Sequence, residues 1–288
     1  MLQRRLRLLQ AVSLNMSMMV GVGPFITIPT IIAAMHGPQA MLGWIVGVFV
    51  ALADGLVWSE LASAFPGSGG TYHFYDAAYG ESRTGRALKF LFVWQFLFSG
   101  PLEVATGAIG LAQYAGFFIP ALNGVAWDWG SLVPGLDAPV RWSNVAGLGV
   151  MGLVTFLAYR RIEVAGRLLV VLWVGMLLTV GWVIVVGLSH FDPKLAFDFP
   201  EGAFSLTTGN AVGLGAALAV AMYDFLGYYQ VCYMGDEVEE PSKTLPRAIL
   251  ISVLAVAAIY LTMNVSILGV LPWREAMESE HVATDMMG

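Results

Sequence analysis

A short run of small residues interrupts a long apolar stretch near the start of the sequence. The run Gly21-Val22-Gly23-Pro24-Phe25 lies in the middle of residues 11–34, a segment long enough to cross a bilayer. Pro24 lacks a backbone N–H and clashes with the preceding turn, so it predicts a break in the helix. Irregular backbone within a bilayer is tolerated only where it is buried in protein or lines a wet cavity. The run therefore indicates a binding site at mid-membrane depth, and a proline-kinked helix whose glycines pack against a neighbour is the alternative.

A carboxylate lies among aromatic residues in a second apolar stretch, residues 209–234. Asp224 stands between Tyr223 and Phe225, and Gly227 follows closely. Aromatic rings at this depth would form the walls of a small-molecule pocket, with a broken helix exposing carbonyls and amides. The alternative is an unbroken helix whose aromatic side chains pack and whose Asp224 pairs locally. Two interrupted spans separated by four ordinary ones favour the pocket, because broken helices occur at corresponding positions of inverted-repeat transporters.

Two further acidic residues stand where the spanning pattern is disturbed. Glu103 lies inside the apolar stretch 87–119, where an acidic side chain costs about 2.5–3.5 kcal/mol on insertion scales. We expect it to bind a cationic substrate group or to carry a proton, unless it is a structural carboxylate bonded to its neighbours. Glu60 precedes the run Pro66-Gly67-Ser68-Gly69-Gly70, which cannot continue a helix. This pattern predicts a gate or hinge at the inner face, with an interfacial carboxylate before an ordinary loop as the alternative.

Seven apolar stretches would position these residues, because a spanning helix needs about 20 apolar residues. Of the 14 Lys and Arg residues, all but Arg141, Lys194 and Arg274 fall on the side that holds the N-terminus. Cytoplasmic segments of membrane proteins carry the excess of basic residues, so the N-terminus is predicted to be cytoplasmic. The predicted spans are residues 11–34, 40–63, 87–119, 145–159, 164–188, 209–234 and 249–271.

The composition excludes an ordinary soluble domain. Hydrophobic residues make up 58% of the chain and charged residues 12%, against about 25% charged in soluble proteins. The net charge of −6 and the short, scattered basic clusters give no sign of nucleic-acid binding. Cys232 is the only cysteine, which excludes an intrachain disulfide, and the four histidines show no metal-ligand spacing. No metal cluster, nucleophile–base arrangement or ATP-binding motif stands out, so neither an enzyme nor direct use of ATP is expected.

Three stretches are similar to the signatures of one membrane-protein family, the amino acid–polyamine–organocation permeases. The first resembles that family's Gly-x-Gly-(Ile/Pro)-Phe signature, the second its Glu-Leu-x-x-x-(Phe/Tyr)-Pro-x-x-Gly-Gly-x-Tyr stretch, and the third its Glu-(Val/Ile)-x-x-Pro loop after the sixth span. They occur in the family's order and on the predicted sides, so the resemblance extends from the first predicted span to the seventh. In this sequence they read Gly21-Val22-Gly23-Pro24-Phe25-Ile26, Glu60-Leu61-Ala62-Ser63-Ala64-Phe65-Pro66-Gly67-Ser68-Gly69-Gly70-Thr71-Tyr72 and Gly235-Asp236-Glu237-Val238-Glu239-Glu240-Pro241-Ser242-Lys243-Thr244-Leu245-Pro246-Arg247-Ala248-Ile249.

The resemblance implies an all-α polytopic membrane helix bundle. Its fold would be of the LeuT type, with two inverted five-helix repeats and broken first and sixth helices. Residues 1–288 would form a single transmembrane domain, with the first repeat in 1–190 and a partial second repeat in 205–288. Members of the family usually have twelve spans, so the second repeat is expected to be incomplete and the chain truncated after its seventh span. The expected location is the cell (inner or plasma) membrane.

The same resemblance implies roles for the residues of the two broken spans. The unwound first span would hold a substrate carboxylate on free N–H groups, which suit an anion at the start of a helix. Carbonyls around residues 223–225 would receive the substrate amine, while Gly227 helps the chain to bend, and Glu60 and Glu237 would serve in gating or coupling. The expected substrate-binding residues are Gly21, Val22, Gly23, Pro24, Phe25, Glu103, Tyr223, Asp224, Phe225 and Gly227.

The leading functional interpretation is a secondary transporter that moves amino acids by alternating access. Asp224 departs from the commonest family pattern, so a polyamine or cationic amino acid permease or exchanger is the alternative. A non-transporting membrane sensor or partner subunit is an alternative of another class, if the truncated chain is complete. No cofactor is expected, and a coupling ion would be H⁺ or Na⁺. The expected partners are the amino acid or polyamine substrate and the lipid bilayer, without nucleic acid; the oligomeric state is left open.

Overall fold

The computed structural model describes residues 6–128, 139–160, 162–279 and 281–287. Arg4, Arg5 and Arg161, which enter the predicted orientation, lie outside the described residues. Within these ranges the chain is mostly helical, as predicted, with one small antiparallel hairpin in addition. The elements are α1 Leu8–Met19, α2 Gly23–Met35, η1 Pro38–Ala40, α3 Met41–Ala64, α4 Thr71–Tyr79, α5 Arg83–Phe118, η2 Pro120–Asn123, β1 Val125–Asp128, β2 Pro139–Arg141, α6 Trp142–Arg160, α7 Ile162–Ser189, α8 Pro193–Ala196, α9 Thr208–Phe225, η4 Gln230–Tyr233, η5 Gly235–Glu237, α10 Pro241–Leu268, α11 Trp273–Ala276 and α12 Val282–Asp285.

Several helices are long and apolar enough to cross a membrane, which agrees with a polytopic fold. In the described residues there are four such helices, and a fifth span results if the bent pair α1 and α2 is counted as one. Two predicted spans take a different form. The fourth contributes the shorter apolar segment Trp142–Phe156, and the sixth is not one continuous helix, because α9 ends at Phe225.

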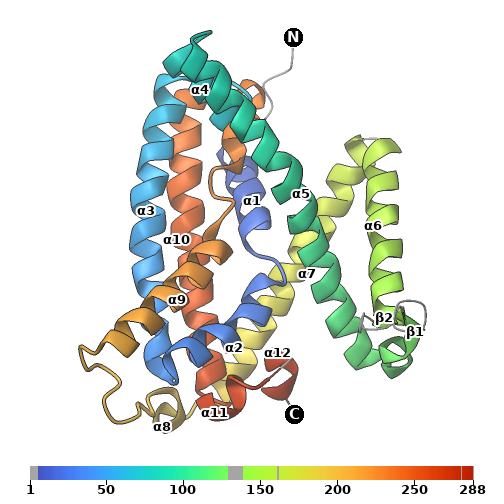
Figure 1. Ribbon diagram of the computed structural model, residues 1–288, viewed down its shortest axis with the longest axis vertical. Helices are drawn as coiled ribbons and strands as arrows, with labels where there is room; N and C mark the ends of the chain where they lie inside the picture. The colour runs from blue at the N-terminus through green and yellow to red at the C-terminus, as the bar shows by residue number, and fades with distance from the viewer. Residues whose placement is uncertain (1–5, 129–138, 161, 280, 288) are drawn as a thin grey trace. The chain divides into compact units, whose positions relative to one another are not determined.

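The chain forms two compact units. The larger unit comprises the described parts of Met1–Trp94 and Met176–Gly288. Within it, α3 and α10 run side by side and α1 packs against α10, while α9 lies against α2 and α3 (Figure 1). Gly43 of α3 contacts Ala217 of α9 directly, so the two backbones approach closely. The division into two repeats stays a prediction.

The smaller unit, Gln95–Gly175, holds the hairpin and α6. Strands β1 and β2 pair in antiparallel register, Trp127 opposite Val140 and Asp128 opposite Pro139. The hairpin leads directly into α6, whose Gly147 lies against the carbonyl of Ala108 in α5. Glu103 belongs to this unit and its side chain is exposed on α5.

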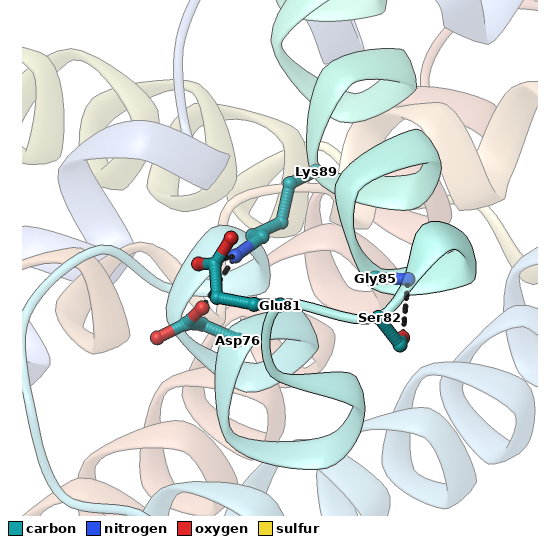
Figure 2. A network of polar contacts seen from close by, with 5 residues as sticks. All are labelled: Asp76, Glu81, Ser82, Gly85 and Lys89. Atoms are coloured by element: carbon teal, nitrogen blue, oxygen red, sulfur yellow. Dashed lines mark hydrogen bonds and ion pairs between the residues drawn. The ribbon is translucent and has the colours of Figure 1, made fainter.

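Lys89, near the beginning of α5, reaches the carboxylates of Asp76 and Glu81 and so joins α5 to α4 (Figure 2). The Lys89 side chain is 8% exposed, and its Nζ donates to Asp76 and, at 3.2 Å, to Glu81. Its ammonium also lies 5.7 Å from the centroid of the Tyr72 ring. The two carboxylates are largely exposed, so the ammonium is the buried member of the cluster.

Substituting the lysine of this cluster and substituting one of its carboxylates should lower the stability unequally. Asp76→Ala leaves the ammonium with Glu81 as its one carboxylate partner of the two and should destabilise the docking of α4. Lys89→Met removes the ammonium and leaves only solvated carboxylates, so a smaller loss of stability is expected than for Asp76→Ala. Hydrogen exchange of the α4 amides measures both, and a larger loss for Lys89→Met would contradict this account.

Candidate functional site

The first predicted break is present in the structure. Helix α1 ends at Met19, α2 begins at Gly23, and the two helices are bent by 52°. Pro24 stands in the first turn of α2, where its missing N–H costs no helical hydrogen bond. Within the part of the chain that the structure describes, the backbone N–H groups of Gly21, Val22 and Gly23 have no hydrogen-bond partner. These amides are therefore free to bind an anion at the N-terminal end of α2.

The second predicted break follows α9 and lies directly against the end of α1. After Phe225 the chain is extended at Leu226, and Gly227 adopts φ +120°, a conformation that side chains disfavour. A Cβ on Gly227 would lie 3.0 Å from the Met18 Cβ and 3.2 Å from the Met19 N. Glycine is therefore required both by the backbone conformation and by the close approach of α1.

The Asp224 carboxylate contacts the first turn of α2. The Asp224 side chain is 4% exposed, and its Oδ2 accepts a hydrogen bond from the Thr27 hydroxyl. Its Oδ1 faces Gly23, since a Cβ there would lie 2.9 Å from that oxygen. The N-terminal turn of a helix favours a negative charge at this place. The structure thus brings together Gly23 and Asp224, two of the predicted site residues that are distant in sequence.

Thr27 is a site residue to which the sequence reasoning gave no role. It lies within the apolar segment 11–34, and its hydroxyl is one helical turn beyond Gly23. Residues four apart lie on the same face of a helix, so a hydroxyl at this spacing from the glycine was a usable signal. Nothing in the sequence indicated that the Thr27 hydroxyl would bond to Asp224.

One tyrosine of α10 joins the two breaks. The Tyr260 hydroxyl donates to the Met19 carbonyl at 2.6 Å and lies 3.2 Å from the Asp224 carbonyl, so it serves the C-terminal ends of both α1 and α9. The side chain is completely buried. Its ring packs against Trp44 with centroids 5.0 Å apart and against Phe225 at 5.4 Å. Tyr260 was not among the predicted site residues, although a phenol in the middle of the stretch 249–271 was visible.

The predicted aromatic residues occupy unlike environments. Phe225 is fully buried, and its ring packs edge-on against Trp44 with centroids 5.8 Å apart. Phe25 is 9% exposed, whereas Tyr223 is 48% exposed. Phe225 therefore supports the end of α9 from within the core, while Tyr223 remains accessible. Their roles in binding stay predictions.

A further carboxylate within a predicted span, Asp54, was not singled out in the sequence analysis. Asp54 lies in α3, and its Oδ2 accepts a hydrogen bond from the hydroxyl of Tyr228, which is 1% exposed. Tyr228 directly follows Gly227, so Asp54 holds the segment beyond the second break. An acidic residue inside the predicted span 40–63 was the same signal that singled out Glu103.

The glycine-rich loop after α3 pairs with the segment that follows the second break. Ser68 N–H donates to Asp236 Oδ2 at 3.2 Å, and Asp236 N–H donates to the Ser68 hydroxyl at 3.0 Å. Gly69 N–H also donates to the Tyr233 carbonyl at 3.2 Å. Two of the quoted sequence stretches are therefore in contact through Asp236.

The two residues predicted to gate lie near this contact without taking part in it through their side chains. Glu60 is exposed in the last turns of α3, and Glu237 is half-buried with its carbonyl bonded to the Leu6 N–H. Farther along, Lys243 donates to Glu240 at 2.8 Å, and this bond holds the pKa of the Glu240 carboxyl below its usual value. The gating role of Glu60 and Glu237 stays a prediction.

Comparison with known proteins gives consistent matches. The sequence profile of the family described as amino acid permease matches residues 6–287. The serine/threonine exchanger SteT of Bacillus subtilis is 28% identical over 286 residues, covering 98% of this chain and 59% of SteT. The branched-chain amino acid permease BcaP of Bacillus subtilis is 24% identical over 284 residues, covering 97% and 58%. The mouse Asc-type amino acid transporter 1 is 27% identical over 291 residues, covering 98% and 51%. The chain therefore spans about half the length of the curated relatives it matches, and they are named as transporters rather than enzymes.

Proposed function

Because the chain belongs to the amino acid permease family, we propose that it forms the substrate site of an amino acid transporter. Family membership and the apolar helices make it a multi-pass membrane protein, within the amino acid–polyamine–organocation superfamily. The observation that carries the proposal is the Asp224 carboxylate beside Gly23, next to the backbone amides of residues 21–23, which have no partner among the described residues. An acceptor for an ammonium group thus adjoins donors for a carboxylate. An α-amino acid presents those two charges on neighbouring atoms.

Each end of the substrate has a separate physical role in this proposal. The substrate carboxylate would bind the N–H groups of Gly21, Val22 and Gly23, where the α2 dipole adds attraction. The substrate ammonium would bind Asp224 Oδ1, while the Thr27 hydroxyl holds Oδ2 and so fixes the carboxylate. Charge-assisted hydrogen bonds of this kind are the strong ones in a site of low dielectric. Transport would follow by rocking of helices around this site in a LeuT-type fold.

A polyamine or cationic amino acid is the second candidate substrate. Its support is that Asp224 presents a full carboxylate where backbone carbonyls alone would suffice for an amine. A diamine lacks a carboxylate, so it would leave the amides of Gly21, Val22 and Gly23 unused. Competition between neutral amino acids and putrescine therefore distinguishes the two candidates.

Asp224→Asn tests the ammonium contact. We expect this variant to bind amino acids at least about tenfold more weakly, since hydrogen bonds to charged groups contribute about 1.5–3 kcal/mol. Ligand-dependent thermal stabilisation of the purified protein measures the affinity for a panel of amino acids and putrescine. Glu201→Gln, the same chemical change on an exposed side chain, is the matched control.

The outcomes of this experiment separate the candidates. Unchanged amino acid binding by Asp224→Asn would refute the role of Asp224 in holding the amine. Binding of putrescine alone would transfer the proposal to a diamine substrate. The coupling ion is proposed to be H⁺ or Na⁺; uptake into proteoliposomes under a pH gradient without sodium indicates H⁺, and uptake that requires sodium indicates Na⁺.

A further inference from the structure

A buried asparagine in the middle of α1 bonds to the segment beyond the second break. Asn15 is 0% exposed. Its Nδ2 donates to the Tyr228 carbonyl and lies 3.3 Å from the Ser252 hydroxyl of α10. Its Oδ1 accepts from the Val231 N–H at 2.9 Å. All of the polar atoms of this side chain are therefore engaged, and every partner lies more than 200 residues away in sequence.

The two backbone groups that Asn15 binds would otherwise bond to each other. In the short helix η4, Gln230 N–H donates to Gly227 O at 3.0 Å and Cys232 N–H donates to Tyr229 O at 2.9 Å. The intervening bond of this three-residue pattern, from Val231 N–H to Tyr228 O, is replaced by the amide of Asn15. The side chain thus acts as an inserted peptide group in a helix that the Gly227 conformation has interrupted.

The two ends of α1 are fastened to the same segment by other contacts. At its start, Leu6 exchanges backbone hydrogen bonds with Glu237 and Glu239, each 2.9 Å, and Arg7 pairs with Glu239 at 3.2 Å. At its end, Met18 lies against Gly227. Asn15 supplies the contact between them. The helix α1 and residues 227–239 are therefore joined along the whole length of α1.

We propose that Asn15 is a positioning residue that keeps residues 227–233 folded against α1, so that the parts of the two broken spans beyond the site move together. Any effect on substrate binding rests on the proposed function, because the joined segments support the ends of α1 and α9 that carry the site. The structural part of the proposal does not depend on any substrate. It predicts that loss of the Asn15 amide opens the segment 227–233 locally.

Cys232 reports this opening without any added label site. It is the only cysteine of the chain, is 1% exposed, and adjoins Val231. We expect Asn15→Leu to raise the rate at which N-ethylmaleimide modifies Cys232 by about tenfold or more, because local opening exposes a thiol that the folded segment shields. Asn15→Ala should raise it as well, because this change also removes both hydrogen bonds and adds no bulk between α1 and the segment.

Asn264→Leu is the matched control. Asn264 is also an asparagine, 2% exposed, but among the described residues its Nδ2 donates to Tyr260 O alone, within its own helix, at 2.8 Å. Its loss should leave the modification rate of Cys232 within about twofold of the wild-type value, because helix α10 keeps its own backbone bonds. Gel filtration and circular dichroism establish that each variant is folded.

The result that overturns the proposal is an unchanged Cys232 rate in folded Asn15→Leu. If that variant does not fold, Asn15→Ala decides in the same assay, and a wild-type rate there also overturns it. Asp224→Asn, assayed in parallel, separates this inference from the proposed function. Increased Cys232 modification in Asn15→Leu together with unchanged amino acid binding by Asp224→Asn would uphold the positioning role and refute only the substrate assignment.

Discussion

Replacing Gly227 with alanine is expected to destabilise the folded chain by roughly 2–5 kcal/mol, the combined cost of a strained backbone and of overpacking. The φ of +120° at this position is rarely adopted by residues with a side chain. The added Cβ would also lie 3.1 Å from the Met18 carbonyl carbon and 3.2 Å from the Met19 nitrogen. Both are backbone atoms at the end of α1, which cannot move aside as a flexible side chain does.

Two other glycines separate the contributions to this loss. Gly202 has φ +78°, and its nearest neighbour would be the Ser205 hydroxyl at 3.5 Å, so Gly202→Ala tests backbone strain without a clash. Gly215 lies inside α9 with open space around it, and Gly215→Ala should stabilise the helix by up to about 1 kcal/mol. Thermal unfolding of the detergent-solubilised variants gives the order. If Gly227→Ala lowers the stability no more than Gly202→Ala does, the end of α1 moves to accommodate the added Cβ, and the predicted overpacking is absent.

The two helix breaks could be predicted because their causes are local. Pro24 lacks the N–H that would continue α1 and favours the first turn of a new helix, and the glycines beside it permit irregular backbone between α1 and α2. In the second break Gly227 gives a weaker signal, since a glycine inside an apolar run is also compatible with close helix packing. The prediction there depended on pairing it with Asp224 and with the first break.

The partners of the polar groups could not be predicted for a physical reason. A polar side chain in an apolar run indicates that it needs a partner, but the sequence does not say which of the other helices supplies it. Thr27 and Asp224, or Asn15 and Tyr228, meet only because α1 and α2 pack beside α9 and α10. Asp54 is the opposite case. Its position as an acidic residue within a predicted span was visible in the sequence, yet the residue was not singled out.

The length of an apolar run also differs from the length of a helix. The stretch 209–234 is mostly apolar, yet α9 ends at Phe225. Hydropathy measures the free energy of transfer into the bilayer, whereas the helix end depends on which groups replace the lost backbone hydrogen bonds. Here Tyr260 and Asn15 supply those bonds on the two sides of the break.

Tyr260→Phe is expected to destabilise the chain by about 1–3 kcal/mol, the cost of leaving a buried carbonyl without the single O–H donor that the tyrosine supplies. The change removes only the hydroxyl, so the contacts of the ring with Trp44 and Phe225 remain and no large cavity forms. The carbonyls of Met19 and Asp224 lose their common donor at the ends of α1 and α9. Amino acid binding should weaken as well, because both ends border the amides and the carboxylate of the site.

Thermal unfolding with and without amino acid measures both effects of Tyr260→Phe. Tyr79→Phe, which removes the hydroxyl from a side chain that is 48% exposed, should change the stability by less than about 0.5 kcal/mol. A Tyr260→Phe protein as stable as the Tyr79→Phe control would contradict the assigned hydrogen bonds.

Combining Tyr260→Phe with Asn15→Leu tests whether both side chains stabilise the same helix break at Gly227. Tyr260 bonds the chain before Gly227 and Asn15 bonds it after Gly227. If both side chains stabilise the same interrupted segment, the first substitution already weakens the hydrogen bonds that the second one removes. The double variant should then be more stable than the sum of the single losses implies, by about 0.5–3 kcal/mol. If the losses of stability in the two single variants add strictly, the two ends of the break respond independently. In that case Tyr260 of α10 and Asn15 of α1 stabilise the site separately.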